Sequence, residues 1–178
     1  MKPLVMEAIK TYKELVYNLN RGPGYDGYTE MVKAIDLNPE EIRQICHWNP
    51  VKYTRNCIYD TDELEALITC WPPRHSGPIH NYNLQQGWIK VLKGMLTIEF
   101  FTIKEGKADG FGHRELKEGE IAWLNDSTGF HQFRNESINN AIAIHFYIDK
   151  IKSWEQFNAQ DGKTSIVRPG YDFHLEGA

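Results

Sequence analysis

The 178-residue sequence has no long apolar run and no excess of positive charge. No stretch approaches the roughly 18 consecutive apolar residues of a transmembrane helix, and charged residues interrupt the N-terminus where a signal peptide has an apolar core. The formal net charge is −4, with Lys and Arg scattered along the chain. Binding to nucleic acid or an anionic membrane would need a basic patch, so neither is expected. We expect a cytoplasmic protein that acts on a small molecule.

Cysteine is also scarce. The three cysteines, Cys46, Cys57 and Cys70, are an odd number without CxxC or CxxH spacing. This pattern argues against a disulfide framework and against a structural zinc site. Free thiols are typical of proteins in a reducing cytosol.

Length and composition predict one domain. A chain that is 41% hydrophobic and 12% aromatic can bury one sizeable core. We expect a single domain over residues 1–178, with a helical N-terminal region (1–50), a β-rich body (51–150) and a C-terminal segment (151–178) packed on that body.

The first 50 residues have the apolar spacing of helices. Apolar residues recur at intervals of three and four over residues 4–19, which predicts an amphipathic helix that ends before the Gly-Pro-Gly at 22–24. A second helix is expected over 28–35. A third begins at Asn38-Pro39, where Asn38 can cap the helix and Pro39 suits its first position.

After residue 50 the pattern changes to short β-rich runs separated by turn residues. Nine such runs with no long helix between them predict a closed all-β body. Lys93-Gly94 is short enough to form a hairpin, and residues 104–107 form a second, looser turn. The runs cover residues 52–58, 64–71, 79–83, 88–93, 95–103, 114–116, 121–124, 131–135 and 141–148.

His80 and Tyr82 are candidate metal ligands. They are two residues apart, so in an extended segment their side chains leave the same face and can share a metal ion. His131 follows a turn at 125–130 and enters a predicted strand. A single histidine is a weak signal, but imidazole is the commonest ligand for iron, nickel, copper and zinc, so two histidines together indicate a metal site.

His145 and Tyr147 alternate with apolar residues in the run 141–148, AIAIHFYI. This alternation places both side chains on one face of the strand, with Ala141 and Ala143. There they can hold a ligand or pass a proton inside a barrel. A solvent-facing polar side of a half-buried strand fits this run equally well.

Several tracts together resemble cysteine dioxygenase, the thiol dioxygenase branch of the cupin superfamily. They occur in the family's order between residues 53 and 147, and the helical first 50 residues also look like the family's N-terminal region. The tracts are Tyr53-Thr54-Arg55-Asn56, the run from Cys70-Trp71 to Ile79-His80, Val91-Leu92 with Gly94, Asn125-Asp126-Ser127 with Gly129 and His131, and the strand with His145 and Tyr147.

The resemblance implies an all-β cupin barrel (a double-stranded β-helix) with a short α-helical N-terminal region. Family members hold mononuclear non-haem iron on three histidines, bind cysteine through sulfur and amine, and add dioxygen to give cysteine sulfinate. By position, His80 and His131 match two of the iron ligands. Arg55 matches the arginine that binds the substrate carboxylate, and His145 and Tyr147 match a pair beside the metal.

Three positions depart from the family pattern. Tyr82 replaces the second histidine of a His-x-His pair, Gly87 replaces a cysteine that some members crosslink to the active-site tyrosine, and Ala143 replaces a serine near His145. No thioether is therefore expected. For Tyr82 three alternatives stay open: a two-histidine site without Tyr82, a site with Tyr82 as third ligand, and a metal-poor or relocated site.

The resemblance predicts a metal-dependent oxygenase acting on L-cysteine or a related small amino thiol with O2. Fe2+ is the expected metal, with nickel or another divalent ion as alternatives, and the changed metal shell allows an altered product. We expect a monomer or small homo-oligomer. The alternative function is a non-catalytic cupin that binds a small amino acid or thiol.

Overall fold

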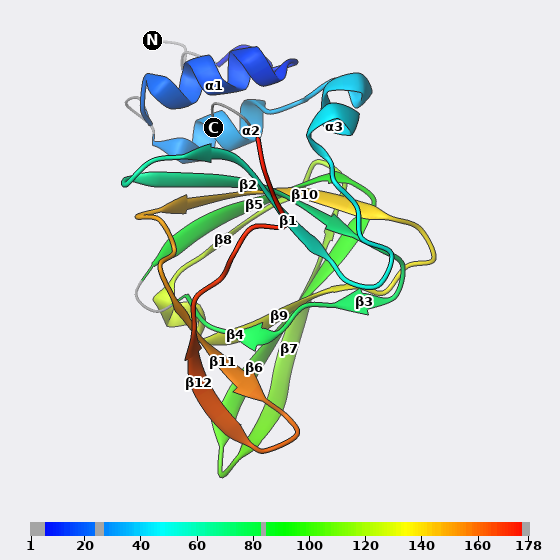
Figure 1. Cartoon of the computed structure of the whole chain (residues 1–178), viewed down its shortest axis with the longest axis vertical. Helices are drawn as coiled ribbons and strands as arrows, with labels where there is room; N and C mark the ends of the chain where they lie inside the picture. Colours follow the sequence, from blue (N-terminus) through cyan, green and yellow to red (C-terminus); the bar gives the residue numbers. More distant parts are fainter. Residues whose placement is uncertain (1–5, 24–26, 83–84, 176–178) are drawn as a thin grey trace.

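The computed structural model describes residues 6–23, 27–82 and 85–175, and consists of two facing β-sheets with three helices against one of them (Figure 1). One sheet has the strand order β13-β1-β2-β10-β5-β8, and the other has the order β12-β11-β4-β9-β6-β7, with β3 paired to β9. The helices are α1 (Tyr12–Asn20), α2 (Tyr28–Ala34) and α3 (Pro39–Ile45). The strands are β1 (Thr54–Asp60), β2 (Leu64–Trp71), β3 (His75–Ser76), β4 (Ile79–His80), β5 (Gln86–Lys93), β6 (Met95–Lys104), β7 (Lys107–Lys117), β8 (Ile121–Leu124), β9 (Phe130–Asn135), β10 (Ala141–Ile148), β11 (Trp154–Asn158), β12 (Lys163–Val167) and β13 (Phe173–His174).

Helix α1 begins at Tyr12, later than the predicted start at residue 4. Residues 4 and 5 of the predicted helix lie outside the described residues. Thr11 has extended backbone and caps the helix, because its side chain accepts a hydrogen bond from the Glu14 amide while Glu14 reaches back to the Thr11 amide. This reciprocal capping box sets the start of the helix. Before the helix, Ile9 forms an isolated parallel bridge with Ile35.

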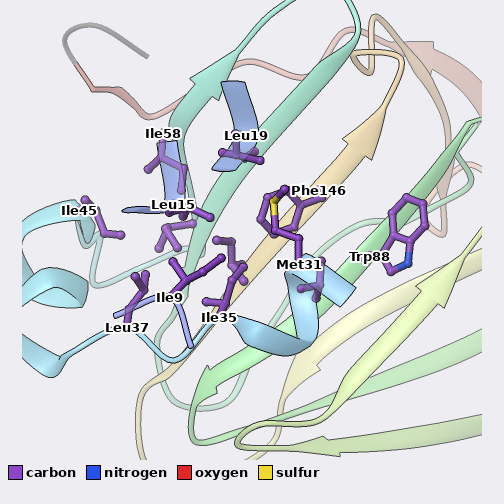
Figure 2. Close-up of a cluster of buried hydrophobic side chains, with 14 of the residues drawn as sticks. Ile9, Leu15, Leu19, Met31, Ile35, Leu37, Ile45, Ile58, Trp88 and Phe146 are labelled. Carbon is purple, nitrogen blue, oxygen red and sulfur yellow. The ribbon is translucent and has the colours of Figure 1, made fainter. Parts of the chain in front are cut away.

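The three helices cover the outer face of the six-stranded sheet (Figures 1 and 2). Leu15 and Leu19 of α1 and Met31 of α2 are buried in one cluster with Ile58 and Phe146 from the sheet. From β10, Ile142 and Ile144 join Phe146 in this cluster. The apolar face predicted for residues 141–148 therefore packs under the helices, which leaves the opposite face of β10 for the barrel interior.

One predicted turn is wrong and the other is tighter than expected. Lys93-Gly94 does not form a hairpin, because β5 pairs with β10 and β8 in one sheet while β6 pairs with β7 and β9 in the other. Gly94, with φ of +78°, carries the chain across between the sheets. The true hairpin joins β6 and β7, where Lys104 pairs with Lys107 across only Glu105 and Gly106. Both turn residues have positive φ, as a tight two-residue hairpin requires.

The C-terminal segment contributes strands to both sheets. None of the nine predicted strands lies in this segment. β11 pairs with β4 and β12, and β13 pairs in parallel with β1. The short β4 would otherwise have an open edge, and β11 satisfies its backbone groups. β11 consequently brings Trp154 to the same end of the barrel as His80. Among the described residues no helix is long and apolar enough to cross a membrane.

Candidate metal and substrate site

His80 and His131 face each other across paired strands at one end of the barrel. They are register partners between β4 and β9, and their ring centroids are 4.6 Å apart. Both side chains are buried. The pair was predicted from sequence as two candidate ligands, and the structure brings them together.

Each of these histidines has its proton position set by the backbone. Nδ1 of His80 lies 3.0 Å from the Pro78 carbonyl, and Nδ1 of His131 lies 3.1 Å from the Gly129 carbonyl. A carbonyl can only accept, so Nδ1 carries the proton and each Nε2 keeps a free lone pair. Burial lowers the pKa of His131 to about 4 and that of His80 well below its usual value. Neutral imidazoles with free Nε2 atoms fit a divalent metal ion.

Tyr82 reaches this histidine pair although β4 ends at His80. Its ring stands edge-on to His131 at 4.6 Å and lies 5.8 Å from His80. Its hydroxyl and Nε2 of His131 are both buried without a hydrogen-bond partner among the described residues. Burial, and then the neighbouring Tyr147, keep the pKa of Tyr82 well above its usual value. Without a metal, Tyr82 is therefore a neutral phenol.

His145 and Tyr147 point into the barrel and are buried, which excludes the solvent-facing interpretation of this strand. The Tyr147 hydroxyl lies 3.0 Å from Nδ1 of His145, and Nε2 of His145 lies 3.0 Å from the Thr69 hydroxyl. Burial lowers the pKa of His145 to about 3, so the ring is neutral. The Tyr147 ring is 5.4 Å from Tyr82, which links this pair to the candidate metal ligands.

Arg55 is held so that part of its guanidinium remains available. Nε donates to the Gly170 carbonyl at 3.1 Å, and the guanidinium lies over the Trp154 ring at 5.1 Å. Its buried Nη2 has no hydrogen-bond partner among the described residues, and the Glu65 carboxylate is 3.7 Å away. Tyr171 donates to that same carboxylate, so Glu65 is shared. A ligand carboxylate would satisfy Nη2.

Trp154 occupies the space between the histidine pair and Arg55. Its ring is 4.6 Å from that of His80, and its indole N–H is buried without a partner among the described residues. The cavity that remains beside Arg55, His80, His145 and Tyr147 is about 20 Å³, roughly the volume for one water molecule.

Cys57, Asp60 and His174 form a second group of possible ligands, which is where a relocated metal site could lie. Atoms of Cys57, Asp60 and His174 lie within 4.8 Å of one another. However, the Lys150 ammonium is 2.6 Å from Asp60 and already neutralises that carboxylate. Burial raises the pKa of the Cys57 thiol to about 11, so the thiolate that a metal needs is disfavoured. The two-histidine centre fits a metal better.

Comparison with known proteins identifies the family. A family model described as cysteine dioxygenase type I matches residues 25–160. The chain belongs to the cysteine dioxygenase family. Among curated relatives, cysteine dioxygenase type 1 of Danio rerio is 25% identical over 175 residues, covering 94% of this chain and 86% of the relative. The Homo sapiens protein of that name is 26% identical over 142 residues, covering 77% and 71% respectively.

Solved structures agree with the predicted fold. A protein from Thermus thermophilus superposes with a TM-score of 0.50 at 16% identity, covering 61% of this chain and 93% of its own. A Klebsiella pneumoniae protein with a double-stranded β-helix domain has a TM-score of 0.49 at 15% identity, covering 72% and 95%. The chain has the predicted all-β cupin fold, with its strands in two facing sheets.

The sequence analysis of this cysteine dioxygenase family member missed Thr69 and Trp154. Thr69 lies on β2, in a run where every residue is buried, and a polar residue in a fully buried strand is a usable signal. Trp154 lay in a segment that was expected to cover the surface, and no pattern in the sequence placed it in the barrel.

Gly87 is predicted to be indispensable for the position of Tyr147. A Cβ atom built at Gly87 would lie 2.7 Å from Cδ1 of Tyr147 and 3.0 Å from the Phe146 carbonyl. Gly87→Ala should displace the tyrosine ring and lower the free energy of unfolding by about 1–3 kcal/mol, measured by urea denaturation. The control is Gly112→Ala, where a Cβ meets nothing within 4 Å. Equal stability of the two variants would contradict this packing.

Stability of the metal-free protein is predicted to fall as the pH drops. Burial lowers the folded-state pKa of His145 to about 3, below the ordinary histidine value of 6.5, so between these values the unfolded chain binds a proton that the folded chain does not. The free energy of unfolding should fall by up to roughly 1.4 kcal/mol per pH unit for each such histidine. His145→Asn should show a shallower decline between pH 6.5 and 4.5 in urea titrations; parallel curves would contradict the assignment.

Proposed function

We propose that the protein is a metal-dependent oxygenase that uses O2 to oxidise the sulfur of L-cysteine or a closely related small amino thiol. Family membership supports the reaction class. The observation that carries the proposal is a group of buried polar atoms without hydrogen-bond partners among the described residues, in and beside one cavity: Nη2 of Arg55, which lines the cavity, and Nε2 of His131 and the Tyr82 hydroxyl, whose rings lie against that of His80 in the cavity wall. Buried polar groups without partners are costly, so a ligand that satisfies them is expected.

The metal would be held by His80 and His131. Their Nδ1 atoms are committed to backbone carbonyls, so both Nε2 lone pairs remain for coordination. Fe2+ is the first expectation because the family is built on mononuclear iron, and nickel or another divalent ion are alternatives. Such a metal would supply the electron exchange with dioxygen that amino-acid side chains cannot provide.

Arg55 would bind the substrate carboxylate. A planar guanidinium whose Nη2 has no hydrogen-bond partner in the described part of the chain suits a carboxylate oxygen. His145 and Tyr147 would handle protons. The imidazole of His145 is neutral and can accept the proton of Tyr147, whose hydroxyl lines the cavity.

Of the three positions that differ from the family pattern, Tyr82 has the largest chemical consequence. By resemblance it stands in place of a histidine, and its ring lies 4.6 Å from that of His131, so its hydroxyl would be a third ligand or a neutral neighbour. A changed metal shell motivates a product other than cysteine sulfinate, including one that rearranges or cleaves the carbon skeleton. Tyr82→Phe removes only the hydroxyl: loss of metal would identify a ligand, and unchanged metal content a neighbour. Tyr82→His should increase iron retention and shift the product towards sulfinate.

The function is tested by measuring metal content, oxygen uptake and products of the reconstituted protein with L-cysteine. We expect close to one metal ion per chain, oxygen uptake that depends on cysteine, and a cysteine-derived oxidation product by mass spectrometry. The His80→Ala, His131→Ala double variant should lose both metal and uptake, whereas His113→Ala, an exposed histidine on β7, should retain them.

Two outcomes would change the proposal. Cysteine sulfinate as the sole product would exclude the altered-product form of it. Binding of cysteine without oxygen uptake at any metal loading would overturn the enzymatic proposal and favour the second candidate, a cupin that binds a small amino acid or thiol through Arg55. That candidate is supported by Nη2 of Arg55, which has no hydrogen-bond partner within the residues that the structure describes and could bind a carboxylate without any metal chemistry.

Trp154 is predicted to set the size of the thiol accepted. Because it fills the space between His80 and Arg55, a substrate that spans them must displace its indole. Trp154→Ala should raise the ratio of kcat/KM (or of affinity) for a bulkier amino thiol such as penicillamine over that for cysteine by about tenfold. The exposed Trp123→Ala is the control. An unchanged ratio would place the substrate elsewhere.

A further inference from the structure

We infer that Thr69 is a positioning residue that fixes His145 in the tautomer protonated at Nε2, and thereby directs the Nδ1 lone pair at Tyr147. This inference deepens the proposed function and rests on it for its kinetic consequence. The tautomer itself is a property of the folded protein and can be measured whether or not the protein turns over a thiol.

The hydroxyl of Thr69 has three partners. It accepts from the Trp71 indole N–H at 2.8 Å, lies 3.0 Å from Nε2 of His145, and lies 3.3 Å from the Ala143 carbonyl as a donor. Thr69, Trp71, Ala143 and His145 are all buried on strands β2 and β10. A hydroxyl has one proton and two lone pairs.

One tautomer of His145 keeps all four of the hydrogen bonds around Thr69 and Tyr147. If Nε2 carries the proton, Thr69 accepts from both Trp71 and His145 and gives its own proton to Ala143, while Tyr147 donates to Nδ1 at 3.0 Å. If Nδ1 carries the proton instead, Tyr147 must accept from it, and the buried Tyr147 proton then loses its partner on His145. The single Thr69 proton would also have to choose between Nε2 of His145 and the Ala143 carbonyl, so the second arrangement keeps three of the four hydrogen bonds and the first is favoured.

The His145 ring therefore lies between two hydroxyls, that of Tyr147 at Nδ1 and that of Thr69 at Nε2. Ala143, which pairs with Thr69 across the strands, has no side-chain hydroxyl, so Thr69 is the partner of Nε2. With Nε2 held in this way, Nδ1 is available to take a proton from Tyr147 at the cavity. Thr69 acts through His145, not on the substrate.

The test uses nitrogen-15 NMR of the metal-free full-length protein labelled at histidine, in which protonated and unprotonated ring nitrogens have separate shifts. The His145 signals are assigned by their loss in His145→Asn. We expect Nε2–H in the parent and in Thr69→Ser, which keeps the hydroxyl. Thr69→Val keeps the shape but removes the acceptor, and should shift His145 towards Nδ1–H; Thr69→Ala serves the same purpose if the valine variant does not fold.

Two further readouts separate positioning from general stability. In the active protein, Thr69→Val should lower kcat about 10- to 100-fold with little change in KM, and Thr69→Ser should restore it. Thr97→Val, which removes a buried threonine hydroxyl on β6 that donates to Glu136, should change neither tautomer nor kcat.

An Nδ1–H parent, or a Thr69→Val protein with the parental tautomer, would overturn the inference even if the proposed oxidation is correct. A tautomer shift in a protein without oxygen uptake would instead count against the proposed function alone.

Discussion

The hydrogen bonds from Nδ1 of His80 and His131 to the carbonyls of Pro78 and Gly129 hold the candidate metal centre in place. In both cases the carbonyl belongs to the residue two positions earlier in the sequence. Each histidine ring is therefore oriented by the backbone that leads into its own strand. Because the rings are buried and neutral, their only unsatisfied capacity is a lone pair on Nε2, and the strand register brings the two rings together. Metal-binding histidines commonly depend on this kind of outer hydrogen bond.

The remainder of the site follows from satisfying buried polar groups around that centre. Thr69 supports His145, His145 supports Tyr147, and Tyr147 packs on Tyr82 beside the histidine pair. On the other side, Gly170 and Trp154 orient Arg55 while its Nη2 has no hydrogen-bond partner among the described residues. A carboxylate-bearing thiol would occupy the region between these two arms, which is why family membership and local geometry support the same class of substrate.

Sequence reasoning recovered those parts of the fold that depend on local patterns. Runs 64–71, 121–124 and 141–148 match β2, β8 and β10 at both ends, because alternation and flanking turn residues define them. The helix start was placed too early because apolar spacing continues before Thr11, whereas the capping box decides the boundary. Gly94 was assigned to a hairpin because a two-residue turn and a crossing between sheets have the same local signal.

The candidate site was predictable where residues carry distinctive chemistry and close spacing. His80, Tyr82, His131, His145, Tyr147 and Arg55 were singled out from the sequence, and the structure gathers them at one cavity or beside it. Thr69 and Trp154 were missed because their importance depends on tertiary pairing: β2 against β10 for Thr69, and β11 against β4 for Trp154. Long-range pairing of this kind leaves no local pattern.

The most direct test of the site's location is anomalous diffraction from crystals of the protein reconstituted anaerobically with Fe2+. The account predicts one iron peak within bonding distance of Nε2 of both His80 and His131. The same map would show whether the Tyr82 oxygen is also bonded. A peak at Cys57, Asp60 and His174, or no ordered iron despite full loading, would contradict the two-histidine centre.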